Sequence, residues 1–226
     1  MKDKLDILYE DNHIIVVVKP ENILSQADNT NDIDMLSIIK SYIKEKYNKP
    51  GNVYLGLVHR LDRPVSGVMV FAKTSKAASR LSDQIRKNEF KKSYLAVVED
   101  NNLKEKDTFI DYLFKDKDFN TKVVSKDKGK YSELSYKILE RDKKNNLCLV
   151  EIELKTGRHH QIRVQFASRN HPLYGDQRYG KEDHKQIALH AYKLEFVHPT
   201  TKEKMSFYKK PDYGIWKKYN INHFDK

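Results

Sequence analysis

The chain has 226 residues, a mass of 26.7 kDa and a formal net charge of +11. Mean hydropathy is −0.79, and the longest aliphatic run, residues 14–18, is too short to cross a bilayer, so a membrane-spanning protein is excluded. The first ten residues carry mixed charges and no apolar stretch, so we expect no secretory signal. The one cysteine, Cys148, excludes an internal disulfide and a cysteine-based zinc site, and we expect it to be a buried strand thiol. These features indicate a basic, globular, cytoplasmic protein.

The apolar pattern predicts an α+β fold. Strands are expected, in chain order, at 14–18, 68–72, 92–98, 134–139, 147–154 and 187–197, with 205–208 beside the last of them. Helices are expected at 35–47, from an N-cap at 74 through 87, and from 158 to 169, with loops around short edge strands at 101–107 and 115–130. Strands dominate and helices do not alternate with them, which predicts a mixed, mainly antiparallel sheet flanked by helices and loops. We expect the tail, with Trp216, to pack on the body.

Arginine is unevenly distributed along the chain. Eight of the nine arginines lie in the windows 60–86 and 158–178, whereas lysine occurs throughout. The planar guanidinium is suited to carboxylates, phosphates and stacked bases in ways that an ammonium group is not. The net charge alone fits either a polyanionic partner or a lysine-rich solvated surface. The clustering favours a functional site built from the two windows.

The first candidate segment contains an aspartate between two arginines. Asp62 is flanked by Arg60 and Arg63 in a loop that Pro64 and Gly67 constrain, just before an apolar strand. Such a loop holds a carboxylate at a fixed point. An ion pair in a surface turn explains the same residues equally well at this stage.

Two further segments carry candidate residues. Residues 154–164 present a dense polar side that includes Arg163, and the alternative is a helix with a solvated basic face. The adjacent His159 and His160 lack the spacing and the companion ligands of a metal site. Tyr94 lies on a strand flanked by lysines, where it fits either a base-stacking residue or a core aromatic with a bonded hydroxyl.

A fourth segment has a pattern that suggests a phosphate-binding loop. Residues 175–182 have the glycine and lysine spacing of a phosphate-binding loop, but Glu182 occupies the position that needs serine or threonine. A carboxylate there would repel phosphate, and we expect no strand before the segment. We therefore expect no nucleoside triphosphate site.

Taken together, these segments resemble the RluA family of RNA pseudouridine synthases. The similar segments follow one another in the family's order over roughly residues 5–212: 7–11, 18–20, 59–62, 66–67, 71–74, 92–96, 156–158, 160–164, 171–172, 175–176, 179–180, 189–191 and 196–199. Pro64-Val65 and His159 depart from the family's usual residues. The resemblance implies the pseudouridine synthase catalytic fold as a single domain over 1–226, with no N-terminal S4 domain.

The resemblance also implies a reaction and the roles of four residues. The reaction is the isomerisation of uridine to pseudouridine in ribosomal or transfer RNA, without cofactor or metal, by a monomer that binds RNA and no membrane. Asp62 is the implied catalytic carboxylate and Arg163 its buried partner. Tyr94 is implied to stack near the uracil, and Arg60 to fill the gap left by a flipped nucleotide. Nucleophilic attack by Asp62 and elimination both stay open.

Two other classes of function remain as alternatives. A non-catalytic RNA-binding assembly factor would use the same basic residues and bind RNA without isomerising it. A hydrolase acting on a glycosidic bond usually needs two carboxylates at that bond, whereas these segments offer one clear reacting aspartate. Release of uracil, rather than its retention in the RNA, would distinguish the hydrolase.

Overall fold

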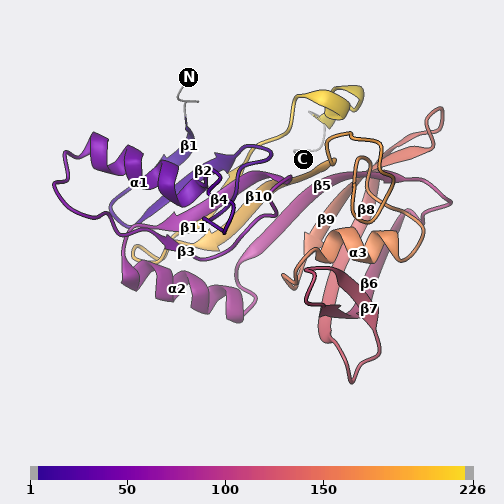
Figure 1. Cartoon of the computed structure of the whole chain (residues 1–226), viewed down its shortest axis with the longest axis horizontal. Helices are drawn as coiled ribbons and strands as arrows, with labels where there is room; N and C mark the ends of the chain where they lie inside the picture. Colours follow the sequence, from indigo (N-terminus) through magenta and orange to yellow (C-terminus); the bar gives the residue numbers. More distant parts are fainter. Residues whose placement is uncertain (1–4, 222–226) are drawn as a thin grey trace. The chain divides into compact units, whose positions relative to one another are not determined.

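The computed structural model describes residues 5–221, which fall into two compact units (Figure 1). The first unit contains residues up to 91 together with 191–209, and the second contains 92–190 together with the chain from 210 onward. The expectation of a single catalytic domain without an S4 domain stays a prediction.

The first unit is built on a small sheet that is mainly antiparallel. Its strands are β1 (Asp6–Glu10), β2 (Ile14–Lys19), β3 (Gly56–Leu57), β4 (Ser66–Ala72), β10 (Leu189–Val197, of which 191–197 belong here) and β11 (Lys204–Tyr208). The order is β1-β2-β4-β10, with β3 beside β4 and β11 beside β10. The pairs β1–β2, β2–β4, β3–β4 and β10–β11 are antiparallel. The expected pairing of 205–208 with the preceding strand is confirmed.

Two helices cover the faces of this sheet (Figure 1). Helix α1 (Met35–Lys46) begins where the Asp34 side chain accepts the Ser37 N–H, and α2 (Ser75–Arg86) begins where Thr74 accepts the Ala77 N–H. Helix α2 buries Ala77 and Leu81 against alternate residues of β2, β4 and β10. Because successive strand residues point to opposite faces, Ile15 and Val17, which are also fully buried, lie on the other face. The expected N-cap at 74 is confirmed.

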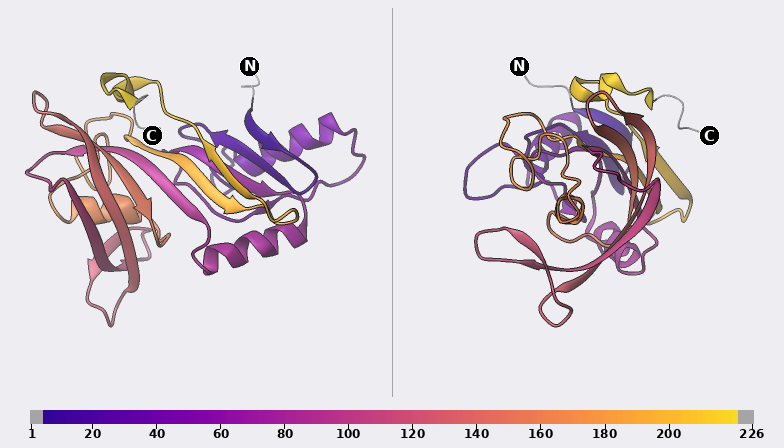
Figure 2. Two further views of the ribbon diagram at one scale, coloured as in Figure 1. Left: turned by 180° about the vertical axis from the view of Figure 1, so that it is seen from behind. Right: turned by 90° about the vertical axis from the view of Figure 1, so that its right-hand side faces the viewer.

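The second unit is built on an antiparallel sheet whose strands are mostly longer. Its strands are β5 (Lys91–Glu99, of which 92–99 belong here), β6 (Lys106–Lys115), β7 (Thr121–Val124), β8 (Lys130–Asp142) and β9 (Leu147–Leu154). The order is β5-β9-β8-β6-β7. Helix α3 (Gln161–Ala167) packs Phe166 against the rings of Phe109 and Tyr136, and Figure 2 shows this helix beside the strands from behind. The mainly antiparallel α+β fold is confirmed.

Several smaller expectations are confirmed in the second unit. The predicted hairpin at 142–146 joins β8 to β9. Cys148 is fully buried on β9, and burial raises the pKa of its thiol to about 12, which makes it an inert core group. Trp216, in the short 3₁₀ helix η1 (Gly214–Lys218), is buried with its ring near His190.

The charged stretches are more regular than their composition suggests. Residues 101–107 and 115–130 were expected to be loops around short edge strands, but β6 has ten residues and pairs with β8 from Lys106 to Leu113. A short β7 then pairs with the end of β6. The expectation of short strands is wrong for β6. Its buried Phe109 and Leu113 are four residues apart on the inner face, and the residues between them are exposed or half-buried, so the buried pattern is sparse.

The predicted helix 158–169 is shorter than expected. It begins at Gln161, because His160 has the left-handed backbone angles φ 51° and ψ 24°. The Gln161 side chain accepts hydrogen bonds from the Arg158 N–H and the Thr156 hydroxyl, which holds the preceding residues in a turn. Arg158 therefore lies outside the helix, and Arg163 lies within its first turn.

Candidate functional site

The loop that carries Asp62 is held on both sides of the aspartate. Asp62 is half-buried in a turn that the Val65 N–H closes on the Asp62 carbonyl at 3.0 Å. On one side, the Ser25 hydroxyl donates to the Leu61 carbonyl at 2.7 Å and accepts the Leu61 N–H at 3.1 Å. On the other side, the carbonyl of Arg63 accepts a hydrogen bond from Lys19. The backbone on each side of the carboxylate is thus fixed.

Lys19 is a buried lysine that sequence analysis missed as a functional residue. Its side chain is fully buried, and Nζ donates to the carbonyls of Pro20, Ile23 and Arg63 at 3.0, 2.6 and 3.0 Å. Burial lowers the pKa of Lys19 to about 7, although the negative charge of Asp62 acts in the opposite direction. The signal in the sequence was a lysine that directly continues a fully apolar strand and precedes a proline.

The other residues of this loop differ in exposure. Arg60 is exposed. Arg63 pairs with Asp32 at 2.7 Å, with both side chains almost half exposed, so the surface ion pair considered for this loop describes Arg63. Gly67 has φ of 134°, and a Cβ there would lie 2.3 Å from the Ala191 carbonyl oxygen, so only glycine fits this position.

Arg163 is buried in the second unit, where the Asp176 carboxylate binds two of its guanidinium nitrogens in the plane of the group. Arg163 Nε donates to Asp176 Oδ2 at 2.8 Å and Nη2 donates to Oδ1 at 2.7 Å, a bidentate pair with 7% and 0% side-chain exposure. Asp176 Oδ1 also accepts the backbone N–H groups of Arg178 and Tyr179 at 3.0 and 3.1 Å. The sequence placed Asp176 only within a family-like segment and assigned it no role.

A ring network lies against the face of the same guanidinium. The Arg163 guanidinium carbon is 5.2 Å from the centre of the Tyr179 ring. The Tyr179 hydroxyl accepts the Thr121 N–H at 3.0 Å and lies 2.8 Å from His160 Nδ1. The His159 ring stacks on His160 at 3.7 Å, and His159 Nδ1 is 2.9 Å from the Thr121 hydroxyl. The network therefore connects α3 to the start of β7.

His160 is neutral in this network. Burial lowers its pKa to about 2, and the positive charge of Arg163 and the neighbouring His159 act in the same direction. A neutral imidazole leaves one ring nitrogen as an acceptor. The Tyr179 hydroxyl accepts from Thr121 and shares a hydrogen bond with His160 Nδ1. The two histidines serve as hydrogen-bonded ring supports.

Tyr94 lies on β5 with 6% of its surface exposed. Lys92, two residues earlier, points to the same side of the strand, and burial lowers its pKa. A Cβ at Gly157 would lie 3.1 Å from Lys92 Nζ, so the lysine reaches the turn before α3. The structure thus places Arg60 and Asp62 on one loop of the first unit, and Tyr94 and Arg163 in the second.

Most arginines of the two windows bind other residues of this chain. Arg80 donates to the Pro199 carbonyl, Arg86 pairs with Asp83 on its own helix, and Arg178 donates to the Phe119 carbonyl. Arg158 and Arg169 likewise bind Tyr131 and Asp111. Most of these arginines therefore hold loops and helix ends, and the functional site built from the two windows stays a prediction.

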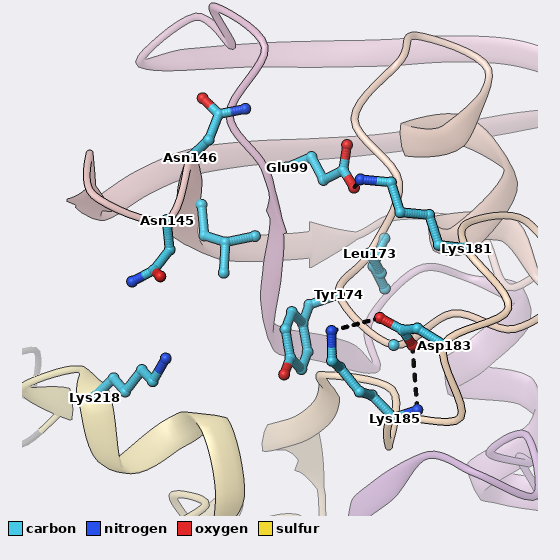
Figure 3. A pocket seen from close by; sticks show the side chains of 11 residues that line it. Glu99, Asn145, Asn146, Leu173, Tyr174, Lys181, Asp183, Lys185 and Lys218 are labelled. Carbon is cyan, nitrogen blue, oxygen red and sulfur yellow. Dashed lines mark hydrogen bonds and ion pairs between the residues drawn. The ribbon is translucent and has the colours of Figure 1, made fainter.

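The second unit also contains a cavity of about 360 Å³. Figure 3 shows Lys181, Lys185 and Lys218 around it, together with Tyr174. Lys181 pairs with Glu99 at 2.6 Å and Lys185 with Asp183 at 2.7 Å, so carboxylates offset two of its three ammonium charges. None of the four site residues predicted from the sequence lines this cavity.

Metal-binding clusters and membrane-spanning helices are both absent from residues 5–221. Among residues 5–221, no group of three or more histidine, cysteine, aspartate or glutamate side chains is arranged to hold a metal ion. No helix within the same residues is long and apolar enough to span a membrane.

The sequence matches the family described as RNA pseudouridylate synthase over residues 13–168. This match covers more than half of the chain and includes Arg60, Asp62, Tyr94 and Arg163. The chain therefore belongs to this family, and the resemblance to its RluA branch is confirmed by relatives named ribosomal large subunit pseudouridine synthases C and D.

Curated relatives match most of this chain. It is 38% identical over 203 residues to the uncharacterized RNA pseudouridine synthase YhcT of Bacillus subtilis, covering 88% of this chain and 66% of that protein. It is 33% identical over 213 residues to ribosomal large subunit pseudouridine synthase C of Buchnera aphidicola, covering 88% and 65%. The chain thus spans slightly less than two thirds of the length of these relatives.

Solved structures share the fold. Human RNA pseudouridylate synthase domain containing 1 aligns with a TM-score of 0.75 at 22% identity, covering 95% of this chain and 86% of its own. Human RNA pseudouridylate synthase domain containing 4 aligns with a TM-score of 0.74 at 20% identity, covering 91% and 88%. The predicted pseudouridine synthase catalytic fold is confirmed.

Proposed function

We propose that this protein is an RNA pseudouridine synthase that isomerises uridine by an aspartate-dependent mechanism without a cofactor. The observation that carries the proposal is the family match over residues 13–168, which includes an Asp62 loop braced on both sides. A rigid loop with a half-buried carboxylate fits a group that has to meet its target in one orientation. No observation favours a non-catalytic binding protein, in which such bracing would serve no reaction.

The reaction rearranges one glycosidic bond and needs no oxidant. The N1–C1′ bond of uridine breaks, the uracil turns, C5 bonds to C1′, and the C5 proton is lost while N1 gains one. We propose that Asp62 acts as the carboxylate, in its ionised form, either on the sugar carbon or by promoting elimination. In this proposal the buried guanidinium of Arg163 pairs with Asp62, which favours the charged carboxylate and orients it.

Tyr94 and Arg60 are proposed to handle the target nucleotide. The buried Tyr94 ring would stack against the uracil and limit where it turns. Arg60 is exposed on the same loop as Asp62, and we propose that its guanidinium plane fills the space left by the flipped nucleotide. Stacking there recovers part of the free energy of unstacking.

The substrate is proposed to be ribosomal or transfer RNA. Relatives carry ribosomal names, and those names support ribosomal RNA as the first substrate to test. Transfer RNA is a second candidate because the net charge of +11 suits any structured polyanion. We propose that the protein acts as a monomer in the cytoplasm, where both RNAs are made and modified in bacteria.

The experiment that tests this function is tritium release from RNA labelled with [5-³H]uridine. RNA is isolated from cells that lack this chain, so that target uridines remain unmodified. We expect the purified protein to release tritium, because C5 loses its hydrogen, and Asp62→Asn to release none while still binding the RNA. Arg63→Gln is the matched control, since Arg63 adjoins Asp62 but pairs with Asp32 on the surface.

The alternatives predict different outcomes. RNA binding without tritium release by the wild-type protein would indicate a binding factor. Release of uracil from the RNA would indicate a hydrolase. Tritium release by Asp62→Asn at the wild-type rate would refute the assignment of Asp62.

A further inference from the structure

We propose that Asp176 is a positioning residue of the isomerisation: its buried carboxylate holds Arg163 in one orientation and balances its charge. The inference rests on the proposed function, because it gives Asp176 a role through Arg163. Asp176 lies outside residues 13–168, over which the family match extends.

The carboxylate of Asp176 is held in place by its own backbone. Oδ1 accepts the N–H groups of Arg178 and Tyr179, and the Gly180 N–H closes the turn on the Asp176 carbonyl at 2.9 Å. Gly175 before it has φ of 72°, and a Cβ there would lie 2.2 Å from the Gln186 carbonyl oxygen. The turn therefore fixes the carboxylate independently of Arg163.

The guanidinium of Arg163 is then held in two directions. Asp176 binds Nε and Nη2 in the plane, and the Tyr179 ring lies against the face. Tyr179 is itself anchored through its hydroxyl to His160 and Thr121. Because Asp176 binds both Nε and Nη2, it sets the orientation of the whole guanidinium plane, including Nη1. A planar fork held on two sides transfers this geometry to the carboxylate it binds.

The charge of Asp176 has a second effect. A lone buried guanidinium would favour the charged carboxylate of Asp62 strongly and make it a weaker nucleophile or base. With Asp176 bound, the Arg163–Asp176 pair is neutral overall, and Arg163 acts mainly through directed hydrogen bonds. Asp176 is therefore expected to affect both the geometry and the reactivity of Asp62.

The structure offers a control pair just beyond the opposite end of α3. Asp111 binds Arg169 in a second bidentate pair, at 2.8 and 3.1 Å, and also accepts the Gln165 amide at 2.7 Å. The two pairs have the same chemistry, but Arg169 has no proposed part in the reaction. Asp111→Asn should therefore reproduce the structural cost of losing such a pair.

The experiment compares Asp176→Asn with Asp111→Asn under single-turnover conditions. The probe is [5-³H]uridine-labelled total RNA from cells that lack the chain, with enzyme in excess. We expect Asp176→Asn to lower the maximal rate about 100-fold. We expect the enzyme concentration at half-maximal rate to change less than about twofold, because substrate binding is retained.

The pH profile supplies a readout that lost stability does not move. In Asp176→Asn the charge of Arg163 is no longer balanced, so the acid limb of the maximal rate should move about one unit to lower pH. Lys19, Arg60 and Arg63 lie around Asp62 in both proteins and do not contribute to this difference. Asp111→Asn should lower the melting temperature and leave the maximal rate and the acid limb unchanged.

Each outcome decides the proposal. A wild-type maximal rate in Asp176→Asn overturns it, and so does a reduced rate with an unmoved acid limb. If Asp176→Asn does not fold, Tyr179→Leu decides: a lowered maximal rate supports the positioning of Arg163, and an unchanged rate overturns it. Failure of the proposed function is seen separately, as absence of tritium release by the wild-type protein or normal release by Asp62→Asn.

Discussion

The most unusual single residue in the structure is Lys19, which has a charged head and no exposed surface. Burying an ammonium group is costly unless hydrogen bonds replace its water, and three backbone carbonyls do so here. One of them belongs to Arg63, directly after Asp62. Burying the lysine therefore costs desolvation free energy, but its hydrogen bonds fix the path of the loop that carries the proposed catalytic carboxylate.

The prediction at this scale concerns Lys19→Met. Methionine keeps most of the volume but donates no hydrogen bond, so the carbonyls of Ile23 and Arg63 lose their donor and the loop relaxes. We expect the maximal single-turnover rate to fall at least about tenfold. RNA binding, measured by filter retention, should remain near the wild-type value.

Lys73→Met is the control for Lys19→Met. Lys73 is also buried in the first unit, where it binds Glu10 at 2.8 Å and the Asp11 carbonyl at 2.5 Å, so its loss removes a buried ammonium group without touching the Asp62 loop. We expect it to lower the melting temperature and keep the maximal rate. Equal rates for Lys19→Met and the wild-type protein would show that the bracing has no catalytic effect.

At the scale of elements, one carboxylate ties β1 to α1 and to the end of β4. Glu10, at the end of β1, accepts hydrogen bonds from Tyr42 and Lys46 of α1 at 2.9 and 2.7 Å. It also accepts from Tyr47 and Lys73. Burial alone would raise the pKa of Glu10, but these four hydrogen bonds outweigh it and hold the pKa at about 2.

The prediction for this contact is a stability that depends on pH. Because the pKa of Glu10 is lower in the folded than in the unfolded chain, its contribution is present above about pH 4.5 and is lost as pH falls toward 2. Glu10→Gln should therefore lower the free energy of unfolding by about 2–3 kcal/mol at pH 7. Urea unfolding at pH 7 and near pH 2 measures this. The difference between the two proteins should shrink at the lower pH, and a constant difference would contradict the assignment.

The charged stretch of the second unit shows how elements depend on their neighbours. Residues 106–115 mix four charged side chains with apolar ones, and they form β6 because β8 supplies a pairing partner along most of their length. Local composition does not reveal that partner. In the same way α3 begins only after His160, because Tyr179 and Thr121 hold that side of the turn, whereas the helical periodicity alone extends back to Arg158.

At the scale of the whole molecule, the net charge of +11 is the dominant feature. Many of the lysines form surface ion pairs with carboxylates, and such exposed pairs contribute little to stability. Because basic residues outnumber acidic ones, positive charge is left over to bind phosphates. Neutralising phosphates releases counterions, which makes RNA affinity fall as salt rises. This electrostatic contribution acts on RNA of any sequence.

The prediction at this scale separates binding from chemistry. With about five phosphate contacts, affinity for total RNA should fall roughly 10²–10³-fold between about 50 and 200 mM salt. The maximal single-turnover rate should stay constant, because the Arg163–Asp176 pair is too buried to be screened and backbone hydrogen bonds hold the Asp62 loop. Filter binding and saturating single-turnover assays measure the two quantities. Affinity that does not change with salt would contradict an electrostatic origin of binding.

The sequence alone determined which chemistry is present. Motif residues lie close together along the chain, so Asp62, Arg60 and Arg163 stood out from local patterns, as did the N-cap Thr74 and the buried strands. It also placed the chain in its family, which the match over residues 13–168 confirms.

Only the tertiary structure decided how those residues are held. Lys19 reaches Arg63 across 44 positions and Ser25 reaches Leu61 across 36, and Asp176 binds a guanidinium 13 residues earlier. Such supports depend on where the backbone carries two distant segments, and their own sequence neighbourhoods do not identify the partner. A buried polar group has to find its hydrogen-bond partner wherever the fold brings one, and for that reason the supports appear only once the chain has folded.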